Sequence, residues 1–474
     1  MTLRVGGTNL ELLSDLMNGG ACVVTNNPVA TMVGDDSTDN VSAWNSLRSQ
    51  YDNFVIPQGT YSFATPMIVP REKRVVGVGI GTTAFTAIKG TSGQPSVIDL
   101  SESASEAFIH LEGLKLTGAA DAALYGEWVN QCRFENLLTD GTFTDGVVFN
   151  NDCFDNVLEH IRVNGDTVSN YCFDFGSGFN ANTCSHLTTA GEGSAANFHV
   201  GGGAASTFNS IVCQGGTLGL YMTGGVAHTF NSMYQENVGG NRVGIATSDI
   251  VVNTVFNACQ FAASTGFADR IACLDLQYAY GMTLNSPAFY TTNLHTPITF
   301  AGGGGSGAYA VARVHPDGNV HSIHVIRGGT GYTSDPSVSV DLSGGSGATA
   351  TAARTGDAVS SVTVTDGGSG YSGAGVCCSI RYKSARRIQV NAPYLNWGSG
   401  GLQSAFYPTI CRDSGATTNS GIEVYTAPTE RLEAGSAMGN MRRAQGYGYM
   451  HYLEELDNSG TEVRWAYVPP ELTT

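Results

Sequence analysis

Carboxylate and amide side chains stand at two fixed distances after an apolar residue that recurs along the chain. Six residues after it stand Asp140, Asn164, Gln214 and Glu236, and eight residues after it stand Asp166 and Glu192. We call these six residues the acidic row. If the recurring segments stack, Asp166 and Glu192 would lie about 5 Å apart along the stack, and Glu192 and Glu236 about 10 Å.

These separations bracket the ones that hydrolysis of a glycosidic bond requires. Two carboxyl groups about 5 Å apart serve a retaining hydrolase, and a separation of about 6.5–9.5 Å serves an inverting one. One carboxyl must stay protonated, through burial or a like-charged neighbour, to act as the acid. Asp166, Glu192 and Glu236 are therefore candidate catalytic residues for cleavage of a polysaccharide. The alternative is that they are solvated acids in surface turns.

A second candidate site combines Asp174, His199 and Tyr221, which occupy the outward position of three successive expected strands. An Asp that orients a His beside a Tyr could abstract a proton, which is the step that β-elimination in a sugar acid needs. Arg162 and His186, on neighbouring segments, could neutralise the carboxylate of that sugar. The alternative is a chance alignment of three polar residues on an exposed face.

Aromatic side chains could serve as stacking platforms for sugar rings, and the candidates are Tyr221, Tyr234 and Tyr290. No cluster of aspartates resembles the site of a calcium-dependent lyase. The sequence therefore predicts that neither a metal nor another cofactor is required.

A repeat between about Leu111 and Pro393 must position all these residues. Its recurring apolar residue, which we call the phase residue, stands at 111, 134, 158, 184, 208, 230, 256 and 284, with separations of 22 to 28 residues. The clearest copies are Thr207–Ser210 and Thr229–Ser232, in which an apolar residue is followed by Asn and a small residue. A period in the twenties in sequence rich in Gly and Asn is typical of the stacked turns of a solenoid.

A second row of triplets with the same period identifies the repeated element as a strand. The triplets mostly alternate between apolar and polar residues, and they are centred on Asp174, His199, Tyr221, Ala246, Asp275 and Thr299. Alternation with period two indicates a half-buried strand. Because strand crossovers are right-handed in nearly all proteins, we expect a right-handed parallel β-helix. Asn209, Asn231, Asn257, Asn285 and Asn391 would then form a structural ladder of stacked amides.

Composition limits the classes of function. The chain has 474 residues, a net charge of −17 and a pI near 4.9, which argues against a nucleic-acid-binding protein. No apolar run is long enough to span a membrane, and residues 1–20 lack the pattern of a secretory signal. The 11 cysteines include no CxxC pair, and we expect them to be buried small apolar residues in a protein made in a reducing cytoplasm.

Elements outside the repeat complete the predicted organisation. A helix from about Val41, capped by Asp39 or Ser37, would plug the N-terminal end of the solenoid with Val41, Trp44, Leu47 and Tyr51. Residues 302–381 contain their own duplication at an offset of 39–40 residues, and removing them restores the period. We therefore predict an N-terminal segment (1–33), a parallel β-helix (34–301), an inserted duplicated β module (302–381), a last coil (382–400) and a C-terminal β region (401–474).

The first coils carry a resemblance to a known family. The run Gly34-Asp35-Asp36-Ser37-Thr38-Asp39-Asn40, followed by Ile56-Pro57-Gln58-Gly59-Thr60-Tyr61 and Val76-Gly77-Val78-Gly79, resembles the opening of the pectate-lyase-like β-helix superfamily. Bacteriophage tailspikes and tail-fibre depolymerases commonly bear this pattern. Pro57-Gln58-Gly59 departs from the usual Pro-Ala-Gly. The resemblance covers about residues 34–300 and 380–400, and it does not fix the catalytic residues.

The resemblance implies a phage tailspike that binds and cleaves a bacterial surface polysaccharide, such as capsule, O-antigen or exopolysaccharide. It further implies a homotrimer, made in the host cytoplasm and joined to other tail proteins in the virion tail. Residues 1–33 would then serve attachment to the particle, and residues 401–474 would supply trimer contacts. The alternatives are a polysaccharide lyase and a non-catalytic receptor-binding tail adhesin.

Overall fold

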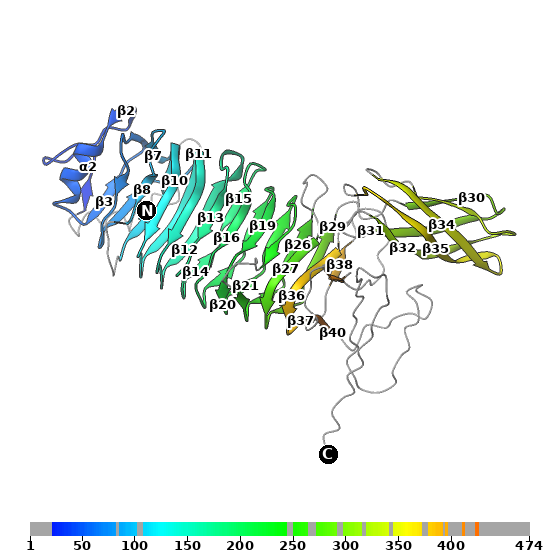
Figure 1. The fold of residues 1–474 in the computed structure, drawn as a ribbon. Coiled ribbons are helices and arrows are strands. Elements are labelled where there is room, and N and C mark those ends of the chain that lie inside the picture. The colour runs from blue at the N-terminus through cyan, green and yellow to red at the C-terminus, as the bar shows by residue number, and fades with distance from the viewer. Residues whose placement is uncertain are drawn as a thin grey trace, which may run out of the picture. The chain divides into compact units, whose positions relative to one another are not determined.

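The protein is an all-β parallel solenoid of about nine turns with very little helix, as predicted (Figure 1). The computed structural model describes residues 21–81, 85–101, 108–243, 250–263, 272–291, 297–314, 319–340, 345–371, 378–391, 394–396, 410–412 and 422–425. The chain divides into two compact units. The first comprises residues 1–238, 242–260 and 278–282, and the second comprises residues 239–241, 261–277 and 283–474.

Parallel ladders of strands build the first unit. The first ladder, which carries the phase residues, contains β1 (Cys22–Val23), β3 (Asn53–Ile56), β6 (Arg74–Gly77), β9 (His110–Glu112), the start of β11 (Arg133–Asn150), β12 (Val157–Asn164), β14 (Thr183–Ser185), β17 (Thr207–Asn209), β21 (Thr229–Asn231) and β25 (Val255–Asn257).

The second ladder contains β2 (Asp35–Asp39), β4 (Gly59–Ser62), β7 (Thr86–Gly90), the start of β10 (Lys115–Glu127), the middle of β11, the end of β12, β15 (Thr188–Ala190), β18 (Val212–Gln214) and β22 (Tyr234–Glu236). The third ladder contains β5 (Met67–Ile68), β8 (Ser96–Asp99), the ends of β10 and β11, β13 (Tyr171–Phe175), β16 (Ala196–Val200), β19 (Leu218–Met222) and β23 (Arg242–Val243). Shorter elements are η1 (Gly165–Thr167), β20 (Gly225–Val226) and β24 (Val251–Val252).

The phase residues of the first unit form one buried column. Backbone register pairs Leu111 with Phe134 and continues through Leu158, Cys184, Phe208 and Phe230 to Phe256. The rings of Phe208 and Phe230 stack with centroids 4.5 Å apart, and those of Phe230 and Phe256 stack at 4.9 Å. This spacing is the inter-strand distance of a sheet, so the predicted column is confirmed.

A tight corner follows each phase residue and explains the small residue of the repeat. The residue two places after the phase position has a positive φ of 48–56° in Asn136, His160, His186, Ser210, Ser232, Ala258 and Ser286. Just before the corner, Asn231 donates to the Asn209 side chain and Asn257 donates to that of Asn231, both at 2.8 Å. The predicted amide ladder is therefore present. At each corner the chain turns out of the strand at a residue with left-handed backbone conformation.

A buried polar ladder lies two residues before the phase position. The side chains of Asn156, Asn182, Ser206 and His228 each accept a hydrogen bond from a backbone N–H of the preceding coil. His228 Nδ1 accepts from the Ser206 N–H, and its Nε2 donates to the Gly202 carbonyl at 3.1 Å. A neutral imidazole satisfies both partners, and burial lowers the pKa of His228 below its ordinary value.

We predict that His228 makes the solenoid sensitive to acid. Above about pH 6.5 the imidazole is neutral in both the folded and the unfolded chain, but below it the unfolded chain takes up the proton first. Stability is therefore lost as the pH falls, by at most about 1.4 kcal/mol per pH unit. Urea unfolding between pH 8 and pH 5 measures this slope. His228→Asn, which restores the amide found at Asn156 and Asn182, should reduce the slope; an unchanged slope would assign the acid sensitivity to other groups.

Helix α2 (Val41–Arg48) lies at the N-terminal end of the solenoid, as predicted (Figure 1). Trp44 and Leu47 are buried, the Trp44 indole donates to the Ile68 carbonyl at 2.7 Å, and its ring packs 4.7 Å from Phe54. Asn40 is the N-cap residue and makes no side-chain capping bond, whereas Asp39 Oδ1 accepts from the Val41 N–H at 3.2 Å. The helix thus covers the open apolar end of the first coils.

The second unit also contains parallel strand pairs. Its strands outside the barrel described below are β26 (Gln260–Ala263), β27 (Ala272–Tyr280), β28 (Thr283–Asn285), β29 (Ala288–Thr291), β36 (Cys378–Arg386), β37 (Ile388–Asn391), β38 (Tyr394–Asn396), β39 (Ile410–Arg412) and β40 (Ile422–Tyr425), of which β26 and β27 are shared with the first unit. Leu284 pairs with Val390, as the period across the insertion predicted. β39 and β40 pair in parallel with β36 and β37, so the solenoid extends beyond residue 400, where the sequence placed its last coil.

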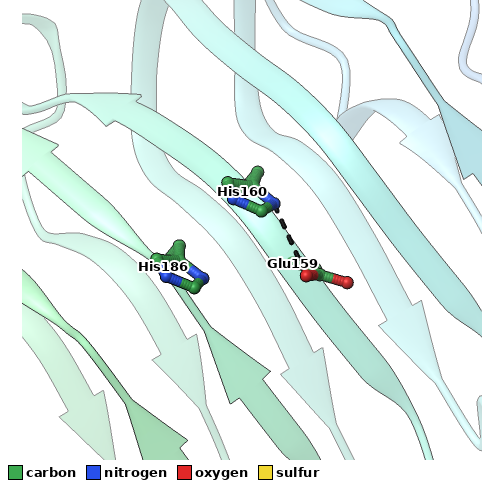
Figure 2. Close-up of side chains that lie close together, drawn as sticks. All are labelled: Glu159, His160 and His186. Carbon is green, nitrogen blue, oxygen red and sulfur yellow. Dashed lines mark ion pairs between the residues drawn. The ribbon is translucent and has the colours of Figure 1, made fainter.

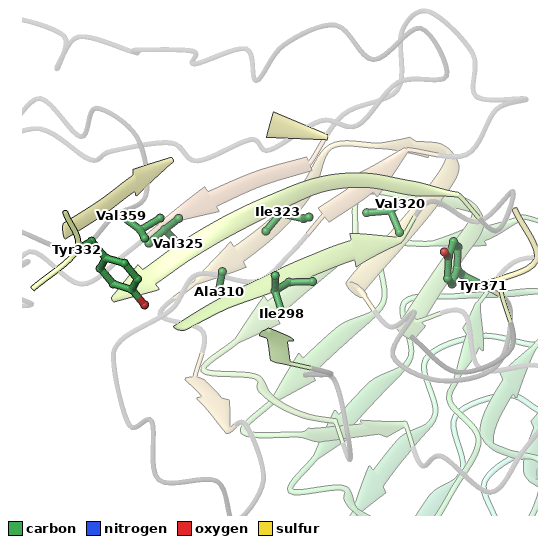
Figure 3. Packing of buried hydrophobic residues seen from close by; sticks show 8 residues of the cluster. All are labelled: Ile298, Ala310, Val320, Ile323, Val325, Tyr332, Val359 and Tyr371. Carbon is green, nitrogen blue, oxygen red and sulfur yellow. The ribbon is translucent and has the colours of Figure 1, made fainter. Parts of the chain in front are cut away.

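The inserted module is a closed antiparallel barrel. Its strands are β30 (Pro297–Ala301), β31 (Ser306–Val314), β32 (Val320–Thr330), β33 (Ser337–Ser339), β34 (Ser346–Thr355) and β35 (Ala358–Ser369). The duplicated halves are the hairpins β31–β32 and β34–β35. In each half a tyrosine, Tyr332 or Tyr371, packs on a glycine, Gly305 or Gly345, where no Cβ would fit. Ile298, Ile323 and Val359 join both tyrosines in the core (Figure 3).

Two sequence assignments differ from the structure at this level. The triplet Ile298–Phe300 belongs to the barrel, through β30, and not to a solenoid row. In the third ladder Tyr221 pairs with Arg242, four residues before Ala246, and the predicted triplet 245–247 lies outside the described residues. Most of the predicted N-terminal segment and of the C-terminal β region also lies outside them.

Eight cysteines, at positions 22, 132, 153, 172, 184, 213, 259 and 273, are free and buried, as expected of small apolar residues. Burial raises the pKa of Cys132 to about 12, so this thiol stays protonated and unreactive. Within the described residues, no helix is long and apolar enough to cross a membrane.

Candidate functional site

The structure brings most of the acidic row into one column of the second ladder. Asp140, Asn164, Ala190, Gln214 and Glu236 follow one another there, with Asn164 paired to Ala190 and Gln214 to Glu236. Asn164 Nδ2 donates to Asp140 Oδ1 at 3.3 Å, and Gln214 Nε2 donates to Glu236 Oε2 at 3.1 Å. The residues that stand six positions after the phase residue are therefore neighbours on adjacent coils, as the sequence predicted.

Asp166 and Glu192 also lie on adjacent coils. The Glu192 N–H donates to Asp166 Oδ1 at 2.8 Å, and Asn237 Nδ2 donates to Glu192 Oε1 at 2.6 Å. Asp166, Glu192 and Glu236 are all exposed. Water therefore solvates each of these three carboxylates.

Asp174, His199 and Tyr221 form a continuous row in the third ladder. Register pairs Asp174 with His199 and His199 with Tyr221, while their strand neighbours Phe173 and Phe198 point into the core. His199 Nδ1 lies 2.6 Å from Asp174 Oδ1, and the two side chains are 15% and 17% exposed. An Asp therefore orients this imidazole in a half-buried place, which is the geometry that the sequence predicted.

Further residues that the sequence did not single out complete this site. The Tyr171 ring stacks on His199 at 4.4 Å, and His199 Nε2 lies 3.1 Å from Thr223 Oγ1. Asp145 Oδ1 accepts from the Tyr171 N–H and from Asn170 Nδ2, each at 2.9 Å. We call Asp145, Tyr171, Asp174, His199, Tyr221 and Thr223 the Asp174 cluster.

Asp145 differs electrostatically from the exposed acids. Burial raises the pKa of its carboxyl, and the negative charge of Asp174 raises it further, against the hydrogen bonds from Tyr171 and Asn170 and the charge of His199. The cluster thus holds two half-buried carboxyl groups in unequal surroundings, Asp145 with a raised pKa and Asp174 bound to His199. Pairs of this kind divide the roles of acid and base.

The predicted substrate-binding residues are not gathered around Asp174. Arg162 is exposed in the second ladder, where its charge helps to lower the pKa of Asp140 behind the stronger effect of Lys115. Tyr234 is 44% exposed in the same ladder. His186 stands at a corner and stacks on His160 (Figure 2). The side chain of Tyr290, in β29, lies outside the described residues.

Comparisons with known proteins find similarity of fold. No family model and no curated protein matches the chain. The N-terminal fragment of bacteriophage Phi29 gene product 12 is 11% identical, with a TM-score of 0.44, over 85% of this chain and 64% of that fragment. The catalytic unit of the GH87 alpha-1,3-glucanase from Streptomyces thermodiastaticus is 10% identical, with a TM-score of 0.48, over 90% and 70% of the two chains.

The gp42 tailspike of Acinetobacter phage vb_AbaP_AS12 is 10% identical, with a TM-score of 0.36, over 70% of this chain and 80% of that one. The chain thus spans less than two thirds of the Phi29 fragment and more of the other two. At such low identity these likenesses concern the solenoid alone, and no functional residue is transferred from them.

Proposed function

We propose that the protein binds a bacterial surface polysaccharide and hydrolyses its glycosidic bonds at the Asp174 cluster. The observation that carries this proposal is the pairing of two half-buried carboxyl groups, Asp145 and Asp174, beside the rings of Tyr171 and Tyr221. Hydrolysis of a glycosidic bond needs one carboxyl as acid and a second as base or nucleophile. The N-terminal resemblance to tailspike β-helices supports the choice of a bacterial glycan as substrate.

The environments of the two carboxyls assign their roles. Asp145 has the raised pKa, so it is the residue that keeps a proton for the leaving oxygen. Asp174 is held by His199 Nδ1 at 2.6 Å, which fixes the orientation of its carboxylate. Asp174 therefore serves as the base or the nucleophile, and His199 positions it.

The tyrosines supply a surface for the sugar. Tyr171 and Tyr221 are half-buried, with ring centroids 6.2 Å apart, and each borders His199. Sugar rings present C–H faces that pack on aromatic rings of this kind. The acidic row, one ladder away, remains a second place at which the chain of a polysaccharide could be bound or cleaved.

The orientation of His199 by Asp174 also favours a second candidate function, polysaccharide cleavage by β-elimination. In that reaction His199 or Tyr221 would abstract the proton, and the product would carry a new double bond. The two reactions leave different products, which makes them separable in one assay.

The test is a screen of the full chain against purified capsular polysaccharides, O-antigens and exopolysaccharides. Release of reducing ends without ultraviolet absorbance from a new double bond supports hydrolysis, and both signals together assign β-elimination. Binding of a glycan with neither signal would overturn the enzymatic proposal and leave a receptor-binding adhesin. We further propose assembly as a homotrimer in a virion tail, for which light scattering in solution is the measurement.

A further inference from the structure

Two imidazoles and a carboxylate meet at one corner of the solenoid (Figure 2). Glu159 lies in β12 at the position after the phase residue, and His160 and His186 occupy the left-handed corner on successive coils. The imidazole rings are parallel within 2°, with centroids 4.6 Å apart, and His160 Nδ1 lies 3.6 Å from Glu159 Oε1. One ligand atom from each residue lies within 4.8 Å of the other two.

The backbone conformation of the corner does not require histidine at positions 160 and 186. Equivalent corners carry Asn136, Ser210, Ser232 and Ala258, all with the same backbone conformation. His160 and His186 are exposed, and among the described residues no hydrogen bond is made by either ring. Neither burial nor hydrogen bonding therefore explains two successive imidazoles, and both exposed rings are accessible to an outside ligand.

Ion pairs of the first ladder orient the carboxylate at this corner. The first ladder carries Arg74 and Arg133 among the three carboxylates Glu112, Glu135 and Glu159. Arg133 Nη2 binds Glu159 Oε2 at 3.1 Å, which leaves Oε1 directed to His160. The carboxylate is thus already oriented with one oxygen toward the imidazoles.

We propose that Glu159, His160 and His186 form a binding site for a divalent transition metal such as Zn²⁺. Imidazole nitrogen together with a single carboxylate is a ligand set that suits zinc, nickel and copper, whereas calcium and magnesium require more oxygen ligands. Metal–ligand bonds of about 2.0–2.2 Å require the three atoms to close from 4.8 Å. Both rings are exposed and can rotate toward each other, and water would complete the coordination.

This inference does not depend on the proposed cleavage of polysaccharide, because the corner and the Asp174 cluster lie on different ladders. His186, which the sequence placed near a sugar acid, stacks on His160 at this corner. The sequence-based prediction that no metal is required concerned catalysis, and this site makes no claim on catalysis.

The test uses the untagged full chain and isothermal titration with Zn²⁺. One zinc per chain is expected. His160→Asn and His186→Asn should each weaken binding by tenfold or more, and the double variant should abolish it. Asn is chosen because Asn136 shows that it fits the same left-handed corner, so the variants should fold. Copper loading gives a second readout, since electron paramagnetic resonance detects coupling to the imidazole nitrogens.

A matched control places a single imidazole at an equivalent corner. Ala258→His adds an exposed histidine in the same conformation but away from Glu159, and it should not add a zinc equivalent. Ser210→His would extend the column next to His186 and should tighten binding. Failure of the wild-type chain to bind zinc, or binding that survives the double His160→Asn and His186→Asn substitution, would overturn the proposal.

Discussion

Asp174→Asn is expected to lower the rate of polysaccharide cleavage by about 10²–10⁴-fold. The amide keeps the shape of the side chain and can still accept a hydrogen bond from His199 Nδ1, now 2.6 Å from Asp174. It cannot act as a base or a nucleophile. The loss should therefore appear in kcat, with little change in KM, when reducing ends are counted at several substrate concentrations.

Asp145→Asn should cost a similar factor and should also change the pH profile. Because the pKa of Asp145 is raised by burial and by Asp174, the wild-type acid keeps its proton to a higher pH than an exposed aspartate would. The wild-type rate should fall as the pH rises through that pKa, which gives the alkaline limb of a bell-shaped profile. Asn cannot titrate, so the residual activity of this variant should lack the alkaline limb.

Glu192→Gln and Glu236→Gln supply the comparison for both substitutions. They remove one negative charge each from the acidic row, on exposed side chains. Loss of cleavage in these two variants, with activity retained in Asp145→Asn and Asp174→Asn, would move the reaction to the acidic row. Equal loss in all four would mean that the two ladders act on one substrate chain.

The register of the first ladder could be predicted from sequence because the motif itself is short and constant. An apolar residue, a polar residue and a left-handed residue fix the strand and its corner in each coil, so the register can be read again from every copy of the motif. For the same reason the offset of six residues placed Gln214 and Glu236 side by side in the second ladder. Periodicity alone sufficed wherever no turn of variable length intervened.

The third ladder was harder to predict because the turns before it differ in length. The number of residues from the phase residue to the residue of the third ladder that aligns with Asp174 varies from coil to coil. It is 16 for Leu158 to Asp174, 13 for Phe208 to Tyr221 and 12 for Phe230 to Arg242. A fixed period therefore missed Arg242 and gave Ala246. Asp145 was missed for a related reason, because β11 runs through three ladders without a turn that marks its place.

Two other features needed coordinates for different reasons. The duplication in residues 302–381 was visible in the markers Tyr332 and Tyr371, but only a closed barrel shows that Ile298 belongs to its core. The stacking of His160 on His186 was missed because the corner position carries different residue types on different coils, so no motif in the sequence pointed to it. A repeat pattern in the sequence does not determine which distant strand closes a barrel, or which side chains stack on neighbouring coils.

Phe230→Asp is expected to prevent folding of the first unit. Phe230 is 1% exposed and stacks between Phe208 at 4.5 Å and Phe256 at 4.9 Å. Removing a buried phenyl ring costs about 3–5 kcal/mol, and a carboxylate without a partner in the same place adds a desolvation penalty. The sum approaches the whole stability of an ordinary domain, about 5–15 kcal/mol, so soluble yield and the cooperative urea transition should both be lost.

Ser232→Asp is the matched control, because it adds the same charge to the same coil at an exposed left-handed corner with φ of 56°. Aspartate tolerates that conformation, so this variant should unfold at nearly the wild-type urea concentration. Phe230→Leu, which keeps the site apolar, should fold with a loss of about 1–3 kcal/mol. A solenoid depends on every coil to cover its neighbours, so a charge in the phase column should be felt by the coils on both sides. A soluble Phe230→Asp protein with a normal transition would show that the column does not hold the coils together.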